Sequence, residues 1–191
     1  MKVIYYEVAK TPSTNTEAKR LMHLWDPYAL TVVTTKHQTA GKGKFGKSWK
    51  SSPKDLLATF CFFLKVQDLD LSQLFRLGTE AVLMLTQELH IKASIKWPND
   101  VLVHNKKLCG VLCETLPSQR HLGVALGIGI NVNTPKEILD AIDQPAISLQ
   151  AILGEEVDVG GLLEKLTTQI IQILRVHIAD MLATQTDFRK I

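Results

Sequence analysis

Hydrophobic positions change period several times along this chain, which predicts an alternation of strands and helices. Short runs rich in β-branched and aromatic residues indicate strands over residues 3–8, 30–35 and 56–64. Apolar positions three and four residues apart indicate helices over residues 71–89 and 159–181. No stretch approaches the roughly 18 consecutive apolar residues of a membrane helix, so no membrane partner is expected.

The middle of the chain reads as a series of strands. Its strand-like pieces lie around Ile95 and over residues 101–104, 108–116 and 122–132. Asn105 and Lys106 predict the turn between the second and third pieces, which would make a hairpin. Strands in the middle and helices towards the end favour an α+β fold, with a mixed β-sheet covered mainly on one face by helices.

The first helix has a start signal of its own. The tetrapeptide TNTE, from Thr14 to Glu17, matches a capping box and predicts a helix that runs to about Trp25. A chain of 191 residues, 46% of them hydrophobic, can bury one sizeable core and is short for two domains of ordinary size. We therefore expect a single domain over residues 1–191.

Positive charge is concentrated in one segment. The whole chain has 22 lysines and arginines against 19 aspartates and glutamates, a net charge of +3. Residues 36–54 hold six of the lysines and no acid, so the remainder of the chain is mildly acidic. A local basic segment suits a small anion better than a long duplex, so no DNA partner is expected. The alternative is a solvated surface loop with no ligand.

The three cysteines indicate a reducing compartment. Cys61, Cys109 and Cys113 form no CxxC pair and leave one cysteine over, so neither a disulfide framework nor a zinc site is indicated. Such cysteines more often serve as small buried hydrophobic residues. The first residues include Glu7 and lack the apolar segment of a secretory signal, which predicts a cytoplasmic protein.

The basic segment contains a glycine-rich stretch, HQTAGKGKFGKSW, that begins at His37. Its three glycines tolerate close backbone approach, so their amides can point at phosphate oxygens while Lys42 and Lys44 supply compensating charge. The spacing also fits GxGxxG, but a strand follows where a dinucleotide fold needs a helix. The stretch is therefore interpreted as an anion cradle.

Two more segments combine residue types suited to chemistry. KWPND, from Lys96 to Asp100, puts a cation, a rigid turn residue, an amide and a carboxylate into five positions between strands. GIGINVN, from Gly127 to Asn133, ends an apolar strand with positions free of side chains, where a flat ligand can lie against the backbone. Taken separately, the first reads as an ordinary turn and the second as a bulged strand end.

Taken in order, five segments of this chain resemble the catalytic domain of the biotin–protein ligases, which include biotin–[acetyl-CoA-carboxylase] ligases and holocarboxylase synthetases. These segments are TNT after Ser13, QTAGKGKFGKSW, KWPNDV, KKLCGVLCE and GIGINVN. The resemblance covers nearly the whole chain and implies a class II aminoacyl-tRNA synthetase-like fold. It also implies that biotin, ATP and Mg²⁺ give biotinyl-5′-AMP, and that the biotinyl group passes to a lysine of a biotin carboxyl carrier protein.

The resemblance also implies roles for individual residues. The biotin end would be lined by Ser13, Thr14, Asn15, Gln38, Gly41, Lys42, Lys107, Gly110 and Gly127. ATP and the adenylate would be held by Lys42, Lys44, Trp49, Asn99 and Asn131. Lys107 and Lys44 would be catalytic, with Asp100 as a ligand of Mg²⁺. A fixed ammonium at position 107 can neutralise the biotin carboxylate and then stabilise charge that develops at phosphorus.

The chain departs from the family pattern in two respects. Lys42 and Lys44 stand where the family usually has arginines, and an ammonium lacks the planar fork that grips a phosphate with two bonds, so looser retention of the adenylate is expected. The chain begins at the ligase core and stops at Ile191. We therefore expect no N-terminal DNA-binding domain, no repressor activity and no small β-rich C-terminal domain.

Two other functions are compatible with these observations. Lipoate ligases and octanoyltransferases share this fold and also acylate a carrier lysine, although the KWPND and GKGKFGKSW segments favour biotin. A non-enzymatic nucleic-acid-binding module would need stacking aromatics interleaved along the basic segment, and these are missing. A homodimer is one assembly compatible with the ligase interpretation.

Overall fold

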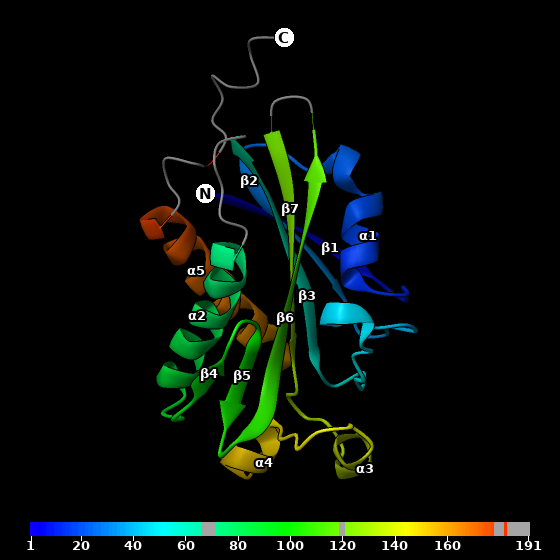
Figure 1. Ribbon diagram of the computed structural model, residues 1–191, viewed down its shortest axis with the longest axis vertical. Helices are drawn as coiled ribbons and strands as arrows, with labels where there is room; N and C mark the ends of the chain where they lie inside the picture. The colour runs from blue at the N-terminus through cyan, green and yellow to red at the C-terminus, as the bar shows by residue number, and fades with distance from the viewer. Residues whose placement is uncertain (66–71, 119–120, 178–181, 183–191) are drawn as a thin grey trace.

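The strands form one mixed sheet. The computed structural model describes residues 1–65, 72–118, 121–177 and 182. Within these residues seven strands lie in the order β1-β2-β3-β7-β6-β5-β4 (Figure 1). β1 and β2 are parallel, and every other neighbouring pair is antiparallel. The strands are β1 (Lys2–Val8), β2 (Ala29–Thr35), β3 (Leu56–Lys65), β4 (Ser94–Lys96), β5 (Asp100–Val103), β6 (Lys106–Pro117) and β7 (His121–Ile130).

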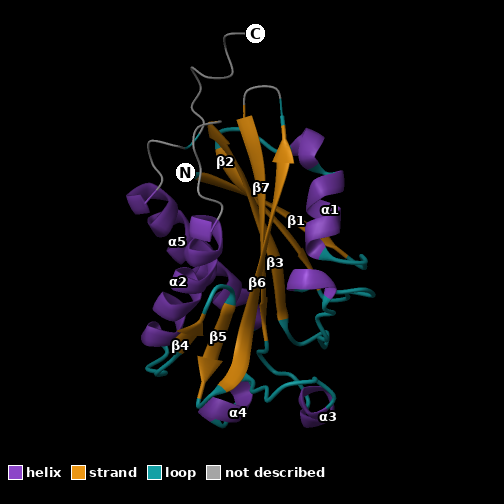
Figure 2. Cartoon of the chain, viewed as in Figure 1, coloured by secondary structure: helices purple, strands orange, loops and turns teal. Residues whose placement is uncertain are grey.

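The helices cover the two faces of the sheet unequally (Figure 2). The two long helices, α2 and α5, pack against each other on one face, and the short α1 lies on the other. This arrangement confirms the predicted α+β fold with helices mainly on one face. The helices are α1 (Thr14–Arg20), η1 (Met22–Leu24), η2 (Lys44–Gly46), α2 (Ser72–Glu88), α3 (Lys136–Asp140), α4 (Leu149–Leu153) and α5 (Val159–His177).

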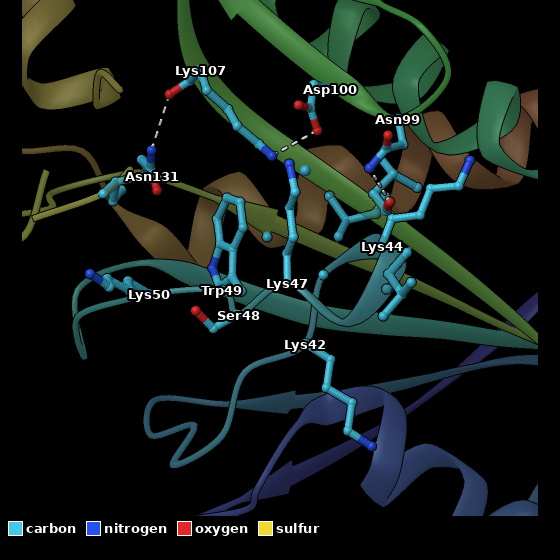
Figure 3. Close-up of a pocket in the computed structure, with 18 of the residues that line it drawn as sticks. Lys42, Lys44, Lys47, Ser48, Trp49, Lys50, Asn99, Asp100, Lys107 and Asn131 are labelled. Carbon is cyan, nitrogen blue, oxygen red and sulfur yellow. Dashed lines mark hydrogen bonds and ion pairs between the residues drawn. The ribbon is translucent and has the colours of Figure 1, made fainter. Parts of the chain in front are cut away.

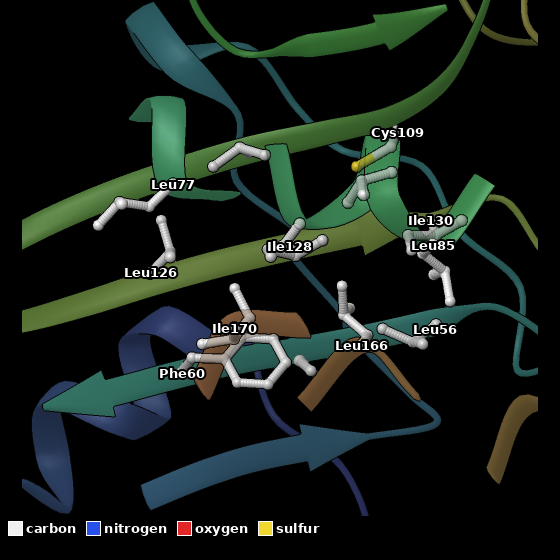
Figure 4. Packing of buried hydrophobic residues seen from close by; sticks show 14 of the residues in the cluster. Leu56, Phe60, Leu77, Leu85, Cys109, Leu126, Ile128, Ile130, Leu166 and Ile170 are labelled. Atoms are coloured by element: carbon white, nitrogen blue, oxygen red, sulfur yellow. The ribbon is translucent and has the colours of Figure 1, made fainter. Parts of the chain in front are cut away.

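The main hydrophobic core lies between the sheet and the long helices (Figure 4). Phe60 of β3 and Leu126 and Ile128 of β7 meet Leu77 of α2 and Ile170 of α5. Each of these side chains is at most 3% exposed. Burying one such side chain stabilises the fold by about 1.5–3 kcal/mol, so this core holds β3 and β7 rigidly at the centre of the sheet.

A smaller cluster fixes α1 on the opposite face. Trp25 and Phe63 pack with ring centroids 5.6 Å apart, and Ala18 of α1 is fully buried beside them. The Trp25 Nε1–H donates a hydrogen bond to the Ala18 carbonyl at 3.1 Å. This anchoring places the start of α1, with Ser13, against the sheet.

The cysteines are buried as expected. Cys61 and Cys109 are fully buried, Cys113 is half-buried, and all three are unpaired thiols. Burial raises the pKa of each thiol, that of Cys113 to about 12. They therefore stay protonated at neutral pH and act as small hydrophobic residues.

The predicted capping box does not form. The N-cap of α1 is Ser13, one residue earlier than predicted, and it makes no side-chain capping bond. Glu17 pairs with Arg20 at 2.6 Å, and the Thr14 N–H donates to Gln38 Oε1 at 2.8 Å. The prediction was wrong because partners from elsewhere in the fold satisfy the helix start.

Two further boundaries differ from the prediction. The α-helix ends at Arg20, and a single 3₁₀ turn follows, which lets the Trp25 side chain fold back under α1. The hairpin turn is formed by His104 and Asn105, with φ of 50° and 59°, and Lys106 already begins β6. A two-residue turn of this kind requires positive φ at both central positions.

The ends of the two long helices are only partly described. The predicted bounds at residue 71 and residues 178–181 lie outside the described residues. Among the helices that are described, none has the length and apolar character needed to cross a bilayer.

Candidate active site

A cavity of about 470 Å³ lies between the start of α1, the basic segment and strands β5, β6 and β7 (Figure 3). Every predicted site residue except Gly41 lines it. Gly41 supports the wall instead, because its carbonyl accepts a hydrogen bond from the Trp49 N–H at 2.9 Å and a Cβ there would lie 2.4 Å from the Trp49 carbonyl oxygen. Motifs spread from Ser13 to Asn131 thus converge on one site.

Lys107 and Asp100 form an ion pair inside this cavity. Lys107 Nζ lies 2.8 Å from Asp100 Oδ1, and each side chain is 14% exposed. The backbone of Lys107 is also held, because its N–H donates to Pro145 O at 2.8 Å and its carbonyl accepts from Asn131 Nδ2 at 3.2 Å. A lysine held in this way presents a fixed and partly desolvated positive charge, which acts on nearby anions more strongly than an exposed one.

Asp100 is also the predicted magnesium ligand. Its Oδ1 faces Lys107, and the described residues contain no group of three His, Cys, Asp or Glu side chains that could hold a metal unaided. Magnesium is usually bound by one or two carboxylates together with substrate phosphate oxygens. Asp100 fits that pattern when a nucleotide supplies the remaining ligands, and its assignment to the metal stays a prediction.

Asn99 ties the KWPND turn to the sheet. The side-chain Nδ2 of Asn99 donates to Val111 O at 3.2 Å, and the backbone carbonyl of Asn99 accepts from the Val111 N–H at 2.8 Å. The Trp97-Pro98 peptide bond in this turn is cis, and the Trp97 side chain is 60% exposed where it lines the cavity. The predicted contact of Asn99 with a nucleotide stays a prediction.

The glycines of β6 and β7 make room for side chains of the protein itself. Gly110 and Gly129 are paired across the two strands, and a Cβ at either would come within 2.9 Å of the Trp49 ring. A Cβ at Gly127 would lie 2.2 Å from Asn15 Oδ1. The sequence predicts that a flat ligand lies against the backbone of these glycines, but the Trp49 indole and the Asn15 amide pack there instead. These two side chains in turn line the cavity.

Apart from Asp100 Oδ1, which is ion-paired with Lys107, two buried polar atoms in the cavity wall have no hydrogen-bond partner among the described residues. They are Trp49 Nε1, a donor, and Asn131 Oδ1, an acceptor. Asn131 is fully buried, and its Nδ2 donates to the carbonyls of Lys107 and Ile147 at 3.2 and 3.1 Å. Leaving such atoms unpaired is costly, so both are suited to a ligand that brings an acceptor and a donor.

The buried end of the cavity is polar. Ser13, Thr14 and Asn15 are at most 5% exposed, and Gln38 Oε1 accepts from the Thr14 N–H. Asn15 Oδ1 accepts from Thr59 Oγ1 at 2.7 Å. Sequence reasoning missed Thr59, because it stands in an apolar strand without a flanking motif. Alternation along that strand, which puts Thr59 on the face opposite Phe60, was the signal that could have found it.

Lys42 and Lys44 of the basic segment do not point towards Lys107 (Figure 3). Lys42 points away from the Lys107–Asp100 pair (Figure 3). Lys44 Nζ lies 4.6 Å from the centroid of the Phe75 ring and 4.9 Å from that of Phe45, which is 88% exposed. Cation–π contacts of this kind hold the Lys44 ammonium on aromatic faces. The catalytic role predicted for Lys44 stays a prediction.

Comparisons with known proteins show which family the chain resembles over most of its length. Residues 7–131 match the model of the Biotin/lipoate A/B protein ligase family. The chain is 32% identical over 168 residues to the Bacillus subtilis protein named Bifunctional ligase/repressor BirA, covering 85% of this chain and 50% of that protein. It is 31% identical over 160 residues to the biotin–[acetyl-CoA-carboxylase] ligase of Paracoccus denitrificans, covering 79% of this chain and 65% of that one.

A solved structure is similar over most of its length. The biotin protein ligase from Aquifex aeolicus in complex with biotin and ATP superposes with a TM-score of 0.74 and 32% identity, covering 90% of this chain and 70% of that chain. With the family match, this places the chain among the ligases that share this mixed-sheet fold. The chain belongs to the Biotin/lipoate A/B protein ligase family. It spans half to two thirds of the length of the two relatives above.

Proposed function

We propose that this chain activates biotin with ATP as biotinyl-5′-AMP and transfers the biotinyl group to a lysine of a biotin carboxyl carrier protein in the cytoplasm. One observation carries this proposal. A single cavity combines a buried polar end, the Lys107–Asp100 pair and a wall with two unpartnered hydrogen-bonding atoms. The similar proteins above are named for biotin, which favours biotin over lipoate as the acid.

Lys107 is suited to the first step. An oxygen of the biotin carboxylate attacks the α-phosphorus of ATP, a new O–P bond forms, and the bond to pyrophosphate breaks. Two anionic groups approach each other, so a fixed positive charge beside them lowers the barrier. Asp100 orients the Lys107 ammonium, and Asn131 holds its backbone. Lys42 and Lys44 would add positive charge near the phosphates.

Trp49 and Asn131 are suited to the adenine. Its edge carries a ring nitrogen that accepts a hydrogen bond and an amino group that donates one, which complements Trp49 Nε1 and Asn131 Oδ1. Mg²⁺ would be held by Asp100 with phosphate oxygens and would neutralise part of the phosphate charge. In the second step the carrier amine attacks the adenylate carbonyl and AMP leaves, so no covalent bond to the chain is needed.

The decisive measurement is pyrophosphate release from ATP and Mg²⁺ with biotin, followed by transfer of labelled biotin to a carrier domain. We expect release that depends on biotin and little release with lipoate or octanoate. Release with lipoate but not biotin would assign the lipoate branch of the family. A protein that releases no pyrophosphate with any acid, yet binds DNA in a salt-dependent shift assay, would support the nucleic-acid-binding alternative.

The basic segment is expected to become protected when ligands bind. Its lysines at 42, 44 and 47 repel one another, and the Gly43 and Lys47 N–H groups bond only within the segment, to Lys47 O and Lys44 O. The negative charge of an adenylate would offset part of this repulsion and order the segment. Limited trypsin digestion should therefore cut at these lysines in the free protein and slow after biotin and ATP are added. Equal cutting in both states would contradict contact between the ligands and the basic segment. Cleavage after Lys2, which is exposed, serves as the control and should not change.

Lys44→Arg is expected to slow the leakage of free biotinyl-adenylate by about fivefold. A guanidinium can give two hydrogen bonds to the single phosphate of the adenylate, and one added charge-assisted bond contributes roughly 1 kcal/mol. The affinity for biotin should not change, because the phosphate is absent before ATP reacts. The measurement is a chase of preformed labelled adenylate into unlabelled excess.

Lys36→Arg is the matched control for that chase, because Lys36 is exposed and does not line the cavity. If Lys44→Arg releases the adenylate as fast as the parent, Lys44 does not contact the phosphate.

A further inference from the structure

Glu114 stands directly behind the buried end of the cavity. Side chains alternate along β6, so Glu114 shares a face with Gly110 and Leu112, which line the cavity, while Cys109 and Val111 face the main core. Glu114 itself does not line the cavity. Any effect of Glu114 on a bound substrate must therefore pass through a neighbour.

That neighbour is Asn15. Glu114 Oε2 accepts a hydrogen bond from Asn15 Nδ2 at 2.9 Å, and Glu114 Oε1 accepts one from Lys19 Nζ at 2.6 Å. Asn15 Nδ2 also donates to Leu112 O at 3.1 Å, and Asn15 Oδ1 accepts from Thr59 Oγ1 at 2.7 Å. Both N–H groups of the amide are thus occupied by acceptors of the protein itself.

The orientation of this amide is defined by its partners. A carboxylate and a backbone carbonyl can only accept hydrogen bonds, so the nitrogen of Asn15 must face Glu114 and Leu112. The hydrogen-bonding capacity left to the amide is the second lone pair on Oδ1. Asn15 is 2% exposed and fits tightly over Gly127, so it has little room to turn.

The charge of Glu114 strengthens this arrangement. Burial opposes ionisation, but the hydrogen bonds from Lys19 and Asn15 and the nearby charge of Lys42 outweigh it and leave the pKa of Glu114 below its usual value. Glu114 is therefore ionised at neutral pH, and hydrogen bonds to a charged acceptor are stronger than those to a neutral one.

We propose that Glu114 is a positioning residue that fixes Asn15 as a hydrogen-bond acceptor for an N–H group of the substrate. This inference rests on the proposed function, because the ureido ring of biotin carries N–H groups. The dithiolane ring of lipoate has none, so an acceptor held in this direction selects for biotin. A site built to bond a donor rejects analogues that lack it more strongly than a hydrophobic pocket would.

The test compares Glu114→Met, which keeps the bulk of the side chain without an acceptor, with Glu114→Gln, which keeps a neutral acceptor. We expect Glu114→Met to raise the KM for biotin about tenfold with little change in kcat, as for loss of a hydrogen bond to a charged group. Glu114→Gln should lie between this variant and the parent. The KM for ATP should not move in either variant.

A double-mutant cycle separates positioning from a general structural effect. Combining Glu114→Met with Asn15→Ala should raise the KM for biotin no further than Asn15→Ala alone, because Glu114 acts through Asn15. Effects that multiply in the double variant, or a wild-type KM in Glu114→Met, would overturn the proposal. If Glu114→Met fails to fold, an unchanged KM in Glu114→Gln would overturn it as well.

Glu80→Gln is the matched control. Glu80 pairs with Arg76 at 2.6 Å on α2, outside the cavity, so losing this carboxylate should leave the KM for biotin unchanged. Failure of the proposed function looks different from failure of the positioning role. If the proposed function is wrong, the unmodified protein itself will release no pyrophosphate with biotin. The proposed role of Glu114 would then be wrong as well.

Discussion

Replacing Lys107 with methionine is expected to slow biotin-dependent pyrophosphate release by about a hundredfold to a thousandfold, the cost of removing one preorganised electrostatic donor. Lys107 is 14% exposed and ion-paired with Asp100 at 2.8 Å, so its charge acts in a partly dehydrated site where water cannot replace it. Single-turnover formation of labelled adenylate measures the step directly.

The neighbouring lysine supplies the matched control for this experiment. Lys106 is exposed at the start of β6 and does not line the cavity, so Lys106→Met should retain the parent rate. Thermal unfolding checks that Lys107→Met remains folded, since the substitution leaves Asp100, which is 14% exposed, without its ion-pair partner. A folded Lys107→Met that forms adenylate at the parent rate would remove Lys107 from the mechanism.

Gly129→Val is expected to raise the KM for ATP by about tenfold to a hundredfold, which is the range for leaving one buried hydrogen-bonding group without its partner. A Cβ at position 129 would lie 2.7 Å from the Trp49 ring, and the added methyl groups have no room while the indole stays in place. The indole must then move away from position 129, and its Nε1–H donor moves with it. Steady-state kinetics in ATP at saturating biotin, and Trp fluorescence, report the two consequences.

Two comparisons make this prediction specific to the nucleotide end. The KM for biotin should change little in Gly129→Val, because Asn15 packs over Gly127, whereas the Trp49 indole packs over Gly129. Gly160→Ala is the control for adding a Cβ, since its nearest neighbour, Asp158 Oδ1, would be 3.4 Å away. An unaltered KM for ATP in Gly129→Val would mean that Trp49 does not contact the base.

Much of the fold followed from local patterns. The strands around Phe60 and Leu126 were predicted at nearly their observed bounds, because a strand buried on both faces carries a run of apolar residues that periodicity reveals. Boundaries were less certain where other segments compete for the same groups. Thr14 bonds to Gln38, 24 residues away, and this contact replaced the predicted capping box.

The composition of the site was also visible in the sequence. The KWPND and GIGINVN segments and the glycine-rich stretch carry the residue types that the cavity uses, and their order along the chain resembles the biotin–protein ligases. What the sequence could not reveal was which partner each side chain meets. The resemblance implies separate roles for Lys107 and Asp100, and the fold joins them in one ion pair.

The sequence by itself determined the strands, the long helices, the location of the positive charge and the motifs whose residues meet at the cavity. Only the tertiary structure decided that Gly110 and Gly129 face each other under Trp49, and that Glu114 reaches Asn15 across 99 residues of sequence. The physical reason is that periodicity reports which face of an element is buried, whereas contacts between elements depend on the pairing register of β6 and β7 and on the packing of α1 against them. These are set by the burial and hydrogen bonding of the whole sheet, which no local pattern records.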